Sequence, residues 1–391
     1  MRTKILILFL LISFNSKGQD VSFSQFDLNM LYMNPALAGY EQNFRILTTR
    51  RNQWVGISEA FNSNVIEFNL TSNIKKRRIS GGEINWTGGI YFIEDRANTV
   101  FKSYEIGIVP WTFHFQLPKS IYISMGLQNT LHFNTLDWNQ LVFSDQINDF
   151  NNTVKPVSSS NAALPAFYNQ SSYLDPSFGF ILTKHSVLNK KSNNTSFIGF
   201  AWHHLYPPMQ SFYNDQGEAT TIPQKFTIHG QFIGSFNDVV TESFNFWKVS
   251  YKHTLQGSNS VQKDDIGLSL SLANNIQLEG GVFYRMSRQI KEGENKVSLM
   301  SESIIPLIRI RMGIGNNMGM ELSYSYDYNI SNLNNINAVA TNEISLNLYY
   351  FSSNPSMCPA QGKWGNNRKW QNVMLNRKGY GMKHKKNRWN W

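Results

Sequence analysis

Two pairs of adjacent polar residues are the first candidates for chemistry in this sequence of 391 residues. His203 and His204 carry imidazoles, which bind zinc in many proteins. Adjacent residues of a strand point to opposite faces, so we expect these two rings to be structural. Asp264 and Asp265 begin a predicted strand without the spaced acidic ligands of a calcium loop. The sequence also has no serine-nucleophile elbow, phosphate-binding loop or His-Glu-x-x-His helix. We therefore predict a non-enzymatic protein with no cofactor and no metal.

Clustered cations are the next candidates. The run from Lys75 to Arg78 lies between two predicted strands, where it is either a solvated hairpin tip or a contact for an acidic partner or lipid headgroups. Arg45, Arg50 and Arg51 lie on the first predicted strand. An arginine that faces lipid at mid-bilayer costs about 2–4 kcal/mol. If the strands form a membrane barrel, these arginines must face its lumen or lie near an interface.

The positive charge is concentrated at one end of the chain. Residues 355–391 contain nine Lys or Arg and no Asp or Glu, while the whole chain has a net charge of +10. Trp364 and Trp370 flank Arg368 and Lys369 in this tail. Such mixtures of cations and aromatic rings bind single-stranded nucleic acid, but they also bind an anionic membrane surface, the cell wall or an acidic protein. Because the chain carries an export signal, we expect a protein or wall partner in the periplasm and no nucleic acid.

The first residues have the pattern of a signal peptide. Arg2 and Lys4 precede an apolar run, residues 5–12, and small residues precede Gln19. No later run reaches the roughly 18–20 apolar residues of a membrane helix, which argues against a polytopic helical protein. The single cysteine, Cys358, excludes an internal disulfide framework.

Alternation with a period of two recurs through most of the remaining chain. Ile66, Phe68 and Leu70 alternate with Glu67, Asn69 and Thr71, which gives a strand one apolar face and one polar face. The same pattern predicts about fourteen strands. They cover residues 43–54, 62–73, 84–94, 99–117, 121–133, 176–185, 195–205, 224–236, 243–254, 264–272, 275–286, 302–314, 318–329 and 341–351.

These strands fit two architectures. Many have the 9–11 residues that a tilted strand needs to cross a bilayer, and short turns alternate with long polar connections such as residues 136–175. That pattern is typical of an all-β transmembrane antiparallel β-barrel. A secreted, soluble β-sandwich would show the same alternation, however, and periodicity alone leaves both architectures open.

The most distinctive stretch runs from Val21 to Trp54. It contains SQF, then LYMNPALAG, then RNQW, and its Asn34-Pro35 step cannot continue a helix. The order and spacing of these motifs resemble the opening of the PorP/SprF family of type IX secretion system membrane proteins. Two later stretches also resemble that family. They are GFAWHHLYPP at residues 199–208 and the final hairpin at 322–351, where Thr-Asn-Glu-Ile replaces the usual Ser-His-Glu-Ile.

The resemblance implies an outer-membrane barrel in the type IX secretion and gliding apparatus, without enzymatic activity. It implies support for the export or surface anchoring of a large adhesin, and contacts with lipid, the periplasmic ring and peptidoglycan-binding subunits. The candidate family-motif or partner-binding residues are Asn34, Pro35, Ala36, Gly39, Arg51, Asn52, Gln53, Trp54, His204, Trp364, Arg368, Lys369 and Trp370.

Two alternative functions remain open at this stage. A transport channel for small solutes would conduct ions in a planar bilayer. A secreted, soluble β-rich binding protein would appear in the soluble extracellular fraction.

The predicted organisation has four parts. Residues 1–18 form a signal peptide, 19–42 an N-terminal periplasmic capping segment, 43–351 the barrel, and 352–391 a basic, Trp-rich periplasmic tail. Residues 32–39 are apolar and rich in turn formers, so we expect them to fold back on the periplasmic end of the barrel.

Overall fold

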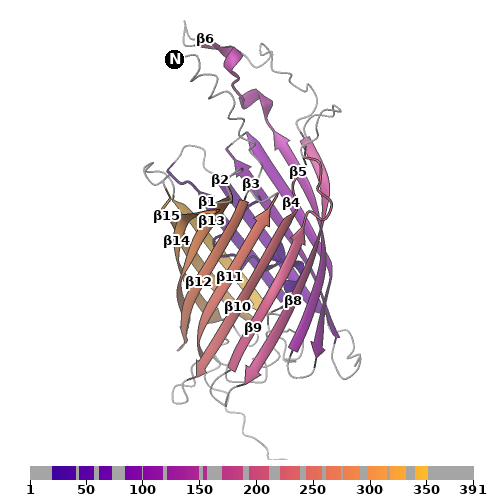
Figure 1. Ribbon diagram of the computed structural model, residues 1–391, viewed down its shortest axis with the longest axis vertical. Helices are drawn as coiled ribbons and strands as arrows, with labels where there is room; N and C mark the ends of the chain where they lie inside the picture. Colours follow the sequence, from indigo (N-terminus) through magenta and orange to yellow (C-terminus); the bar gives the residue numbers. More distant parts are fainter. Residues whose placement is uncertain are drawn as a thin grey trace, which may run out of the picture.

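The chain forms one closed antiparallel barrel of fourteen strands (Figure 1). Our computed structural model describes residues 20–40, 44–56, 61–72, 84–98, 100–117, 121–148, 153–155, 170–187, 193–210, 221–237, 244–257, 261–273, 276–290, 297–314, 318–331 and 340–350. Around the barrel the order is β1-β16-β15-β14-β13-β12-β11-β10-β9-β8-β5-β4-β3-β2. Every strand therefore pairs with its neighbour in the chain, and β1 pairs with β16 to close the wall.

The wall and its connections have the following bounds. The barrel strands are β1 (Phe44–Gln53), β2 (Phe61–Ser72), β3 (Ile84–Ala97), β4 (Phe101–Leu117), β5 (Ile121–Leu136), β8 (Gln170–Val187), β9 (Asn193–His203), β10 (Lys225–Asn237), β11 (Phe244–Gln256), β12 (Val261–Ala273), β13 (Gln277–Ile290), β14 (Val297–Gly313), β15 (Met318–Asn329) and β16 (Thr341–Tyr350). The short elements are α2 (Met30–Met33), η1 (Pro35–Leu37), η3 (Trp138–Gln140), η4 (Ser144–Gln146), β6 (Ile147–Asn148) and β7 (Thr153–Val154).

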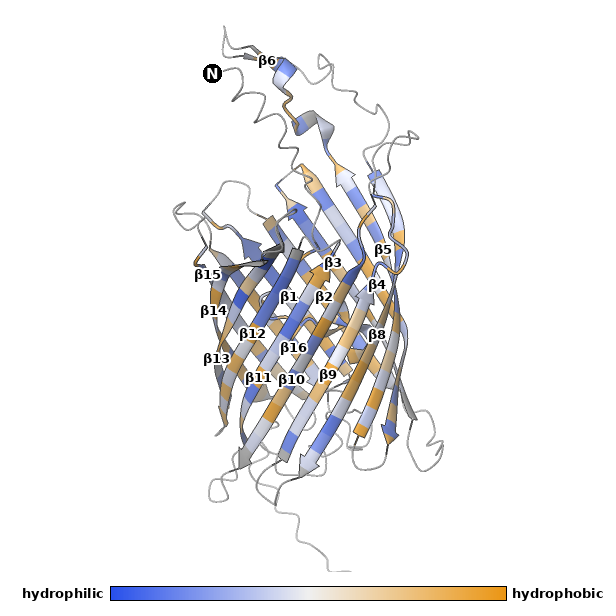
Figure 2. Ribbon diagram, in the orientation of Figure 1, coloured by the Kyte–Doolittle hydropathy of each residue, from blue (hydrophilic) through white to orange (hydrophobic). Residues whose placement is uncertain are grey.

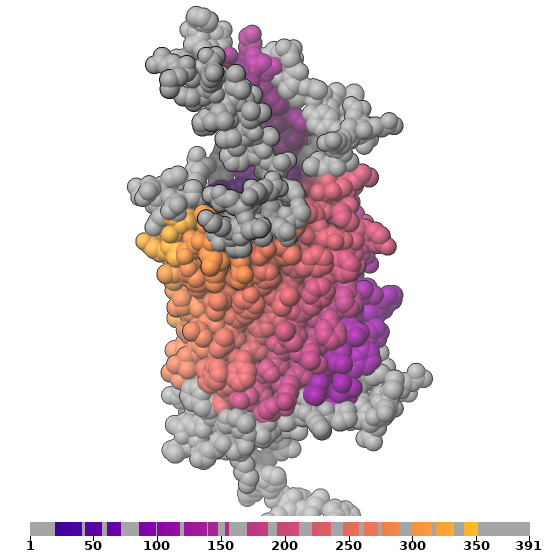
Figure 3. All heavy atoms as spheres, viewed as in Figure 1, coloured from indigo at the N-terminus to yellow at the C-terminus, as the bar shows by residue number. Residues whose placement is uncertain are grey.

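The direction of the alternation decides between the two architectures. On β2 the apolar residues Ile66, Phe68 and Leu70 are 40–58% exposed on the outside, while Glu67 is fully buried in the lumen. Figure 2 shows hydrophobic residues distributed along the strands of the barrel wall. Figure 3 shows that the side chains leave no gap in the side of the wall that faces the viewer. A soluble sandwich buries its apolar faces. An apolar exterior around a polar interior is the arrangement of a membrane barrel.

The predicted strands are confirmed in number and order, and several are longer than predicted, most of all at the starts of β8 and β14. β8 begins at Gln170 and β14 at Val297, several residues before the predicted starts at 176 and 302. The early residues of β8 are polar, so they lack the alternation that marks a membrane strand. They extend the sheet because their backbone pairs with β5, for example Gln170 with Thr135.

The two ends of the barrel differ. At one end, called the terminal end, β1 begins and β16 finishes, and Phe44 pairs with Tyr350. The longest connections leave the other end, called the loop end. Between β5 and β8, one of these connections contains the small sheet β6-β7, which rises beyond the barrel (Figure 1). Among the described residues, no helix is long and apolar enough to span a membrane.

Residues 20–40, called the luminal segment, lie inside the barrel. Most of them are buried, including Phe23, Leu31 and Ala36. The chain runs from Asp20, which contacts Gln256 at the loop end, to Tyr40, which contacts Thr183 towards the terminal end. The predicted cap on the barrel end is therefore corrected to a plug in its lumen.

Candidate functional site

The interface between the luminal segment and the wall is the candidate functional site, because it contains the most distinctive motif of the chain. Its central turn follows from local sequence. α2 ends at Met33, and Asn34 is extended with φ −161° because a proline follows it. η1 then begins at Pro35, and Gly39 turns the chain with φ +65°, a conformation that favours glycine.

Asn34 connects this turn to three strands. Its Oδ1 accepts a hydrogen bond from the backbone N–H of Ala36 at 2.9 Å, which caps η1. Its Nδ2 lies 3.1 Å from the carbonyl oxygen of Phe200, 3.4 Å from that of Phe180 and 2.8 Å from Nε2 of His229. Asn34 is fully buried, so losing these partners would leave a desolvated amide.

Two wall glycines allow the turn to approach. A Cβ on Gly179 of β8 would lie 2.0 Å from the Asn34 Oδ1, and a Cβ on Gly126 of β5 would lie 2.5 Å from the Pro35 carbonyl. Both distances are far below van der Waals contact. Thr112 of β4 adds a hydrogen bond of 2.8 Å to the same Pro35 carbonyl. The wall is therefore shaped for the Asn-Pro-Ala turn.

Apolar packing extends the contact in both directions. Phe26 of the luminal segment lies 5.3 Å from the ring of Phe283, and Tyr32 packs edge-on against Tyr91 at 6.0 Å. Inward-facing apolar residues of the wall meet the segment in two buried clusters. Their wall members are Ile181, Phe283, Ile305 and Leu307 in one cluster, and Val65, Tyr91, Ile93 and Val109 in the other.

An acid of the luminal segment joins a buried ion network. Both oxygens of Asp27 pair with Arg309 of β14, at 2.6 and 2.7 Å, and Lys248 of β11 lies 2.9 Å away. Glu279 of β13 also contacts Lys248, at 2.7 Å. Burial raises the pKa of Asp27, but the adjacent Arg309 and Lys248 outweigh it and hold that pKa well below the usual range. The carboxylate is therefore charged at physiological pH.

A carboxylate of the last strand holds the start of the family motif. Glu343 of β16 accepts backbone hydrogen bonds from Ser24 at 2.7 Å and Gln25 at 3.0 Å. Arg51 of β1 lies 3.8 Å from the same carboxylate. The two backbone hydrogen bonds join residues more than 300 positions apart in sequence. The glutamate of the Thr-Asn-Glu-Ile sequence is thus a partner of the SQF sequence.

Ion pairs hold the start of the luminal segment at the loop end of the barrel. Asp20 forms an ion pair with Lys225 of β10 and lies 3.1 Å from Nε2 of His204. Nδ1 of His204 lies 2.8 Å from Asp175 of β8. Burial lowers the pKa of His204, but the Asp20 and Asp175 carboxylates outweigh this effect and raise the pKa to about 9. His204 is therefore a cation between two carboxylates at neutral pH.

The histidine pair differs from the prediction. His203 and His204 both face the lumen, because His204 has left the strand and adopts φ +56°. The expectation that they point to opposite faces is therefore wrong. His203 contacts the Met33 carbonyl at 3.3 Å, while His204 contacts Asp20 and Asp175. Among the residues that the structure describes, no group of three or more His, Cys, Asp or Glu is arranged to hold a metal ion.

The other predicted site residues are dispersed. Asn34, Pro35, Ala36 and Gly39 belong to the luminal turn. Arg51 is buried in the lumen, as Arg45 is, whereas Arg50 is exposed on the outside, three residues before β1 ends. Asn52, Gln53 and Trp54 are half-buried at the loop end, where the Trp54 ring packs on Phe61 at 5.2 Å. The signal peptide, the run 75–78 and the tail residues Trp364, Arg368, Lys369 and Trp370 lie outside the described residues.

Comparison with known proteins gives one family. A family model described as "Type IX secretion system membrane protein PorP/SprF" matches residues 15–348. No curated protein matches the chain.

Solved barrels resemble the fold at low identity. The beta domain of the Bordetella autotransporter Brka is 8% identical, with a TM-score of 0.41, over 79% of this chain and 98% of that one. A deltaS2 mutant of the TodX monoaromatic hydrocarbon channel is 8% identical, with a TM-score of 0.42, over 82% and 94%. The translocator domain of the autotransporter NalP from Neisseria meningitidis is 7% identical, with a TM-score of 0.31, over 83% and 94%.

Proposed function

Since this chain belongs to the PorP/SprF family of type IX secretion system membrane proteins, we propose that it is a plugged outer-membrane scaffold of that apparatus rather than a channel. The family is one of secretion membrane proteins, and the fold is a closed antiparallel barrel, so the proposed role is not enzymatic. In this proposal the barrel supports the export or surface anchoring of a large adhesin-type client. It does so by holding periplasmic ring and peptidoglycan-binding subunits at the membrane.

One observation carries the choice of scaffold over channel. The luminal segment occupies the barrel interior along its length and is fixed there by Asn34, Asp27 and Asp20. A route for small solutes requires an open lumen. Here the same residues that carry the family resemblance fill it, so the most distinctive sequence serves to close the barrel.

The basic tail is our candidate for the periplasmic contact. Both barrel termini leave the terminal end, and bacterial outer-membrane barrels turn that end to the periplasm. With nine cations and no acids, residues 355–391 cannot neutralise themselves and are suited to an acidic surface. Trp364 and Trp370 add apolar contacts that salt does not screen.

Truncation after Phe351 tests this proposal. We expect the truncated barrel to insert normally, as judged by heat-modifiable migration, and to lose periplasmic subunits that co-purify with the full chain from native outer membrane. A full-length variant with Arg368→Gln and Lys369→Gln separates charge from length, and it should weaken the same co-purification in a salt-dependent way. Undiminished co-purification after truncation, or cleavage of the tail by protease added to intact cells, would contradict the proposal.

A further inference from the structure

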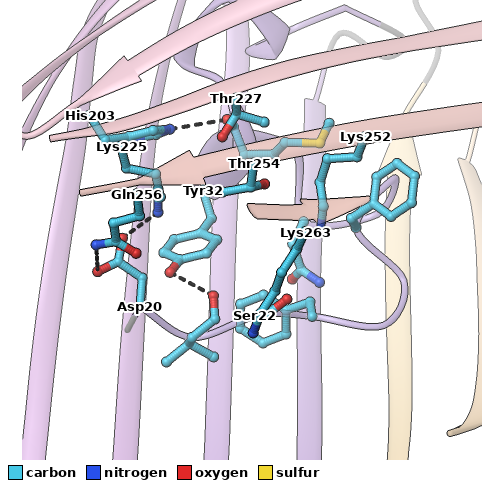
Figure 4. Close-up of a pocket in the computed structure, with 15 residues that line it drawn as sticks. Asp20, Ser22, Tyr32, His203, Lys225, Thr227, Lys252, Thr254, Gln256 and Lys263 are labelled. Atoms are coloured by element: carbon cyan, nitrogen blue, oxygen red, sulfur yellow. Dashed lines mark hydrogen bonds and ion pairs between the residues drawn. The ribbon is translucent and has the colours of Figure 1, made fainter. Parts of the chain in front are cut away.

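A cavity remains between the luminal segment and strands β9 to β12. It has a volume of about 70 Å³ and lies towards the loop end, where β9 and β11 finish and β10 and β12 begin. Since a single water needs roughly 10–15 Å³ by this measure, the space accepts a small polar group with a few carbons. Figure 4 shows Asp20, Lys225 and Gln256 together on one side of it, with Lys263 on another.

The walls of this cavity are of two kinds. One part is apolar and comes from the luminal segment, through Phe23, Phe26, Tyr32 and Met33. The other part is polar and carries three lysines against one acid. Its charged members are Lys225, Lys252, Lys263 and Asp20. An excess of cations beside aromatic rings favours an anion that carries an apolar group.

The three lysines are not equivalent. Lys225 is paired with Asp20, and Lys252 is paired with Asp265 at 2.7 Å. Lys263 forms no hydrogen bond or ion pair with another described residue. Burial and the cations Arg285 and Lys252 act against its charged form, whereas Glu302 and Asp265 favour that form electrostatically. Lys263 therefore presents an ammonium group with unused donor capacity at the cavity.

A second polar group that lines the cavity, the side chain of Asn29 in the luminal segment, also lacks a partner. Asn29 is 1% exposed and lines the cavity. Neither Nδ2 nor Oδ1 of its side chain has a hydrogen-bond partner among the described residues. A buried amide without partners is costly, so its presence at a cavity suggests a ligand that satisfies it. The hydroxyls of Thr227 and Thr254 line the same space.

We propose that this cavity binds a carboxylate group carried on a short apolar arm. The ammonium of Lys263 pairs with the carboxylate, and Nδ2 of Asn29 donates a hydrogen bond to it. The arm packs on the rings of Phe26 and Tyr32, which are already fixed by Lys252 at 4.8 Å and Lys225 at 5.1 Å from their centroids. Such a carboxylate is found in free short-chain acids and in the acidic side chains of polypeptides.

The test uses the full-length barrel in lipid nanodiscs at low ionic strength and measures binding by isothermal titration calorimetry. The probes are pentanoate, pentylamine and pentanol, together with the peptides acetyl-Ala-Glu-amide and acetyl-Ala-Gln-amide. We expect pentanoate to bind, and the amine and alcohol not to bind. If the glutamate peptide alone binds, the ligand is a polypeptide side chain, and if pentanoate binds as well, free acids are also accepted. Failure of both carboxylates to bind at millimolar concentration overturns the proposal.

Three variants locate the site. Lys263→Gln should weaken carboxylate binding tenfold or more, since a charge-assisted hydrogen bond is lost, and Lys263→Arg should restore most of it. Lys184→Gln is the matched control, because Lys184 lies on β8 away from the cavity and is exposed. Heat-modifiable migration verifies that each variant is folded. Unchanged affinity in Lys263→Gln, or an equal loss in Lys184→Gln, would overturn the assignment.

Discussion

At the scale of single residues, two glycines of the barrel wall leave the space that the luminal segment occupies. Gly179→Ala would place a Cβ 2.0 Å from the Asn34 Oδ1, so the Asn-Pro-Ala turn would have to move. We expect a loss of about 1–3 kcal/mol of stability, typical of overpacking. The measurement is the urea midpoint of the heat-modifiable folded form. Gly280→Ala is the matched control, because a Cβ there meets nothing within 4 Å, and equal midpoints for the two variants would refute the tight fit.

The charged contact at Asp20 predicts a dependence on alkaline pH. The pKa of His204 is about 9 in the folded protein, above its ordinary value of 6.5, because Asp20 and Asp175 stabilise the cation. The contact therefore contributes fully below about pH 6.5 and is lost as the pH rises through about 9. Hydrogen exchange at residues 20–24, corrected for its intrinsic pH dependence, should accelerate from pH 7 to pH 10. His204→Gln should remove that change, and an unaltered profile in the variant would count against this role.

Some of these residues could be recognised from sequence and others could not. The motif around Asn34 was recognisable, because its spacing matches a family pattern. The network of Asp27, Arg309 and Lys248 was missed, although it left a signal. Arg309 and Arg311 alternate with outward apolar residues on a membrane strand, so both must face the lumen, where a buried charge needs a partner.

At the scale of elements, the outward faces of the strands should respond to charge according to depth. Leu268 is 62% exposed at the middle of β12, whereas Leu299 is 65% exposed near the loop end of β14. We expect Leu268→Arg to cost about 2–4 kcal/mol and Leu299→Arg about 0–1 kcal/mol. Urea titration of folding into lipid bilayers measures both. Equal costs at the two positions would be incompatible with a bilayer centred on the strands.

The strands were predictable because their signal is local. Alternation on β2 or β12 is visible within a few residues, and a membrane strand must show it along its whole crossing. The position of the luminal segment is not local. It depends on contacts such as Ser24 with Glu343, which lie 319 residues apart. Turn chemistry at Asn34 and Gly39 predicted compactness correctly, but it carried no information about which surface would enclose the turn.

At the scale of the whole molecule, the path of the chain favours a membrane scaffold over a channel for small solutes. The barrel strands begin and end at the terminal end, while Asp20 lies near Gln256 at the loop end. The luminal segment therefore runs through most of the barrel before β1 begins. A closed interior and an outward apolar wall suit the scaffold in the membrane that we propose.

Ion conductance across a planar bilayer tests this central claim most directly. We predict that the full-length barrel inserts but gives no steady conductance. A variant that combines Asn34→Ala with Asp27→Ala removes two of the main attachments of the luminal segment and serves as a positive control for insertion. That variant should show openings, because the segment is no longer held in the lumen. Steady, open conductance of the unaltered protein would contradict the plugged scaffold and favour a channel for small solutes.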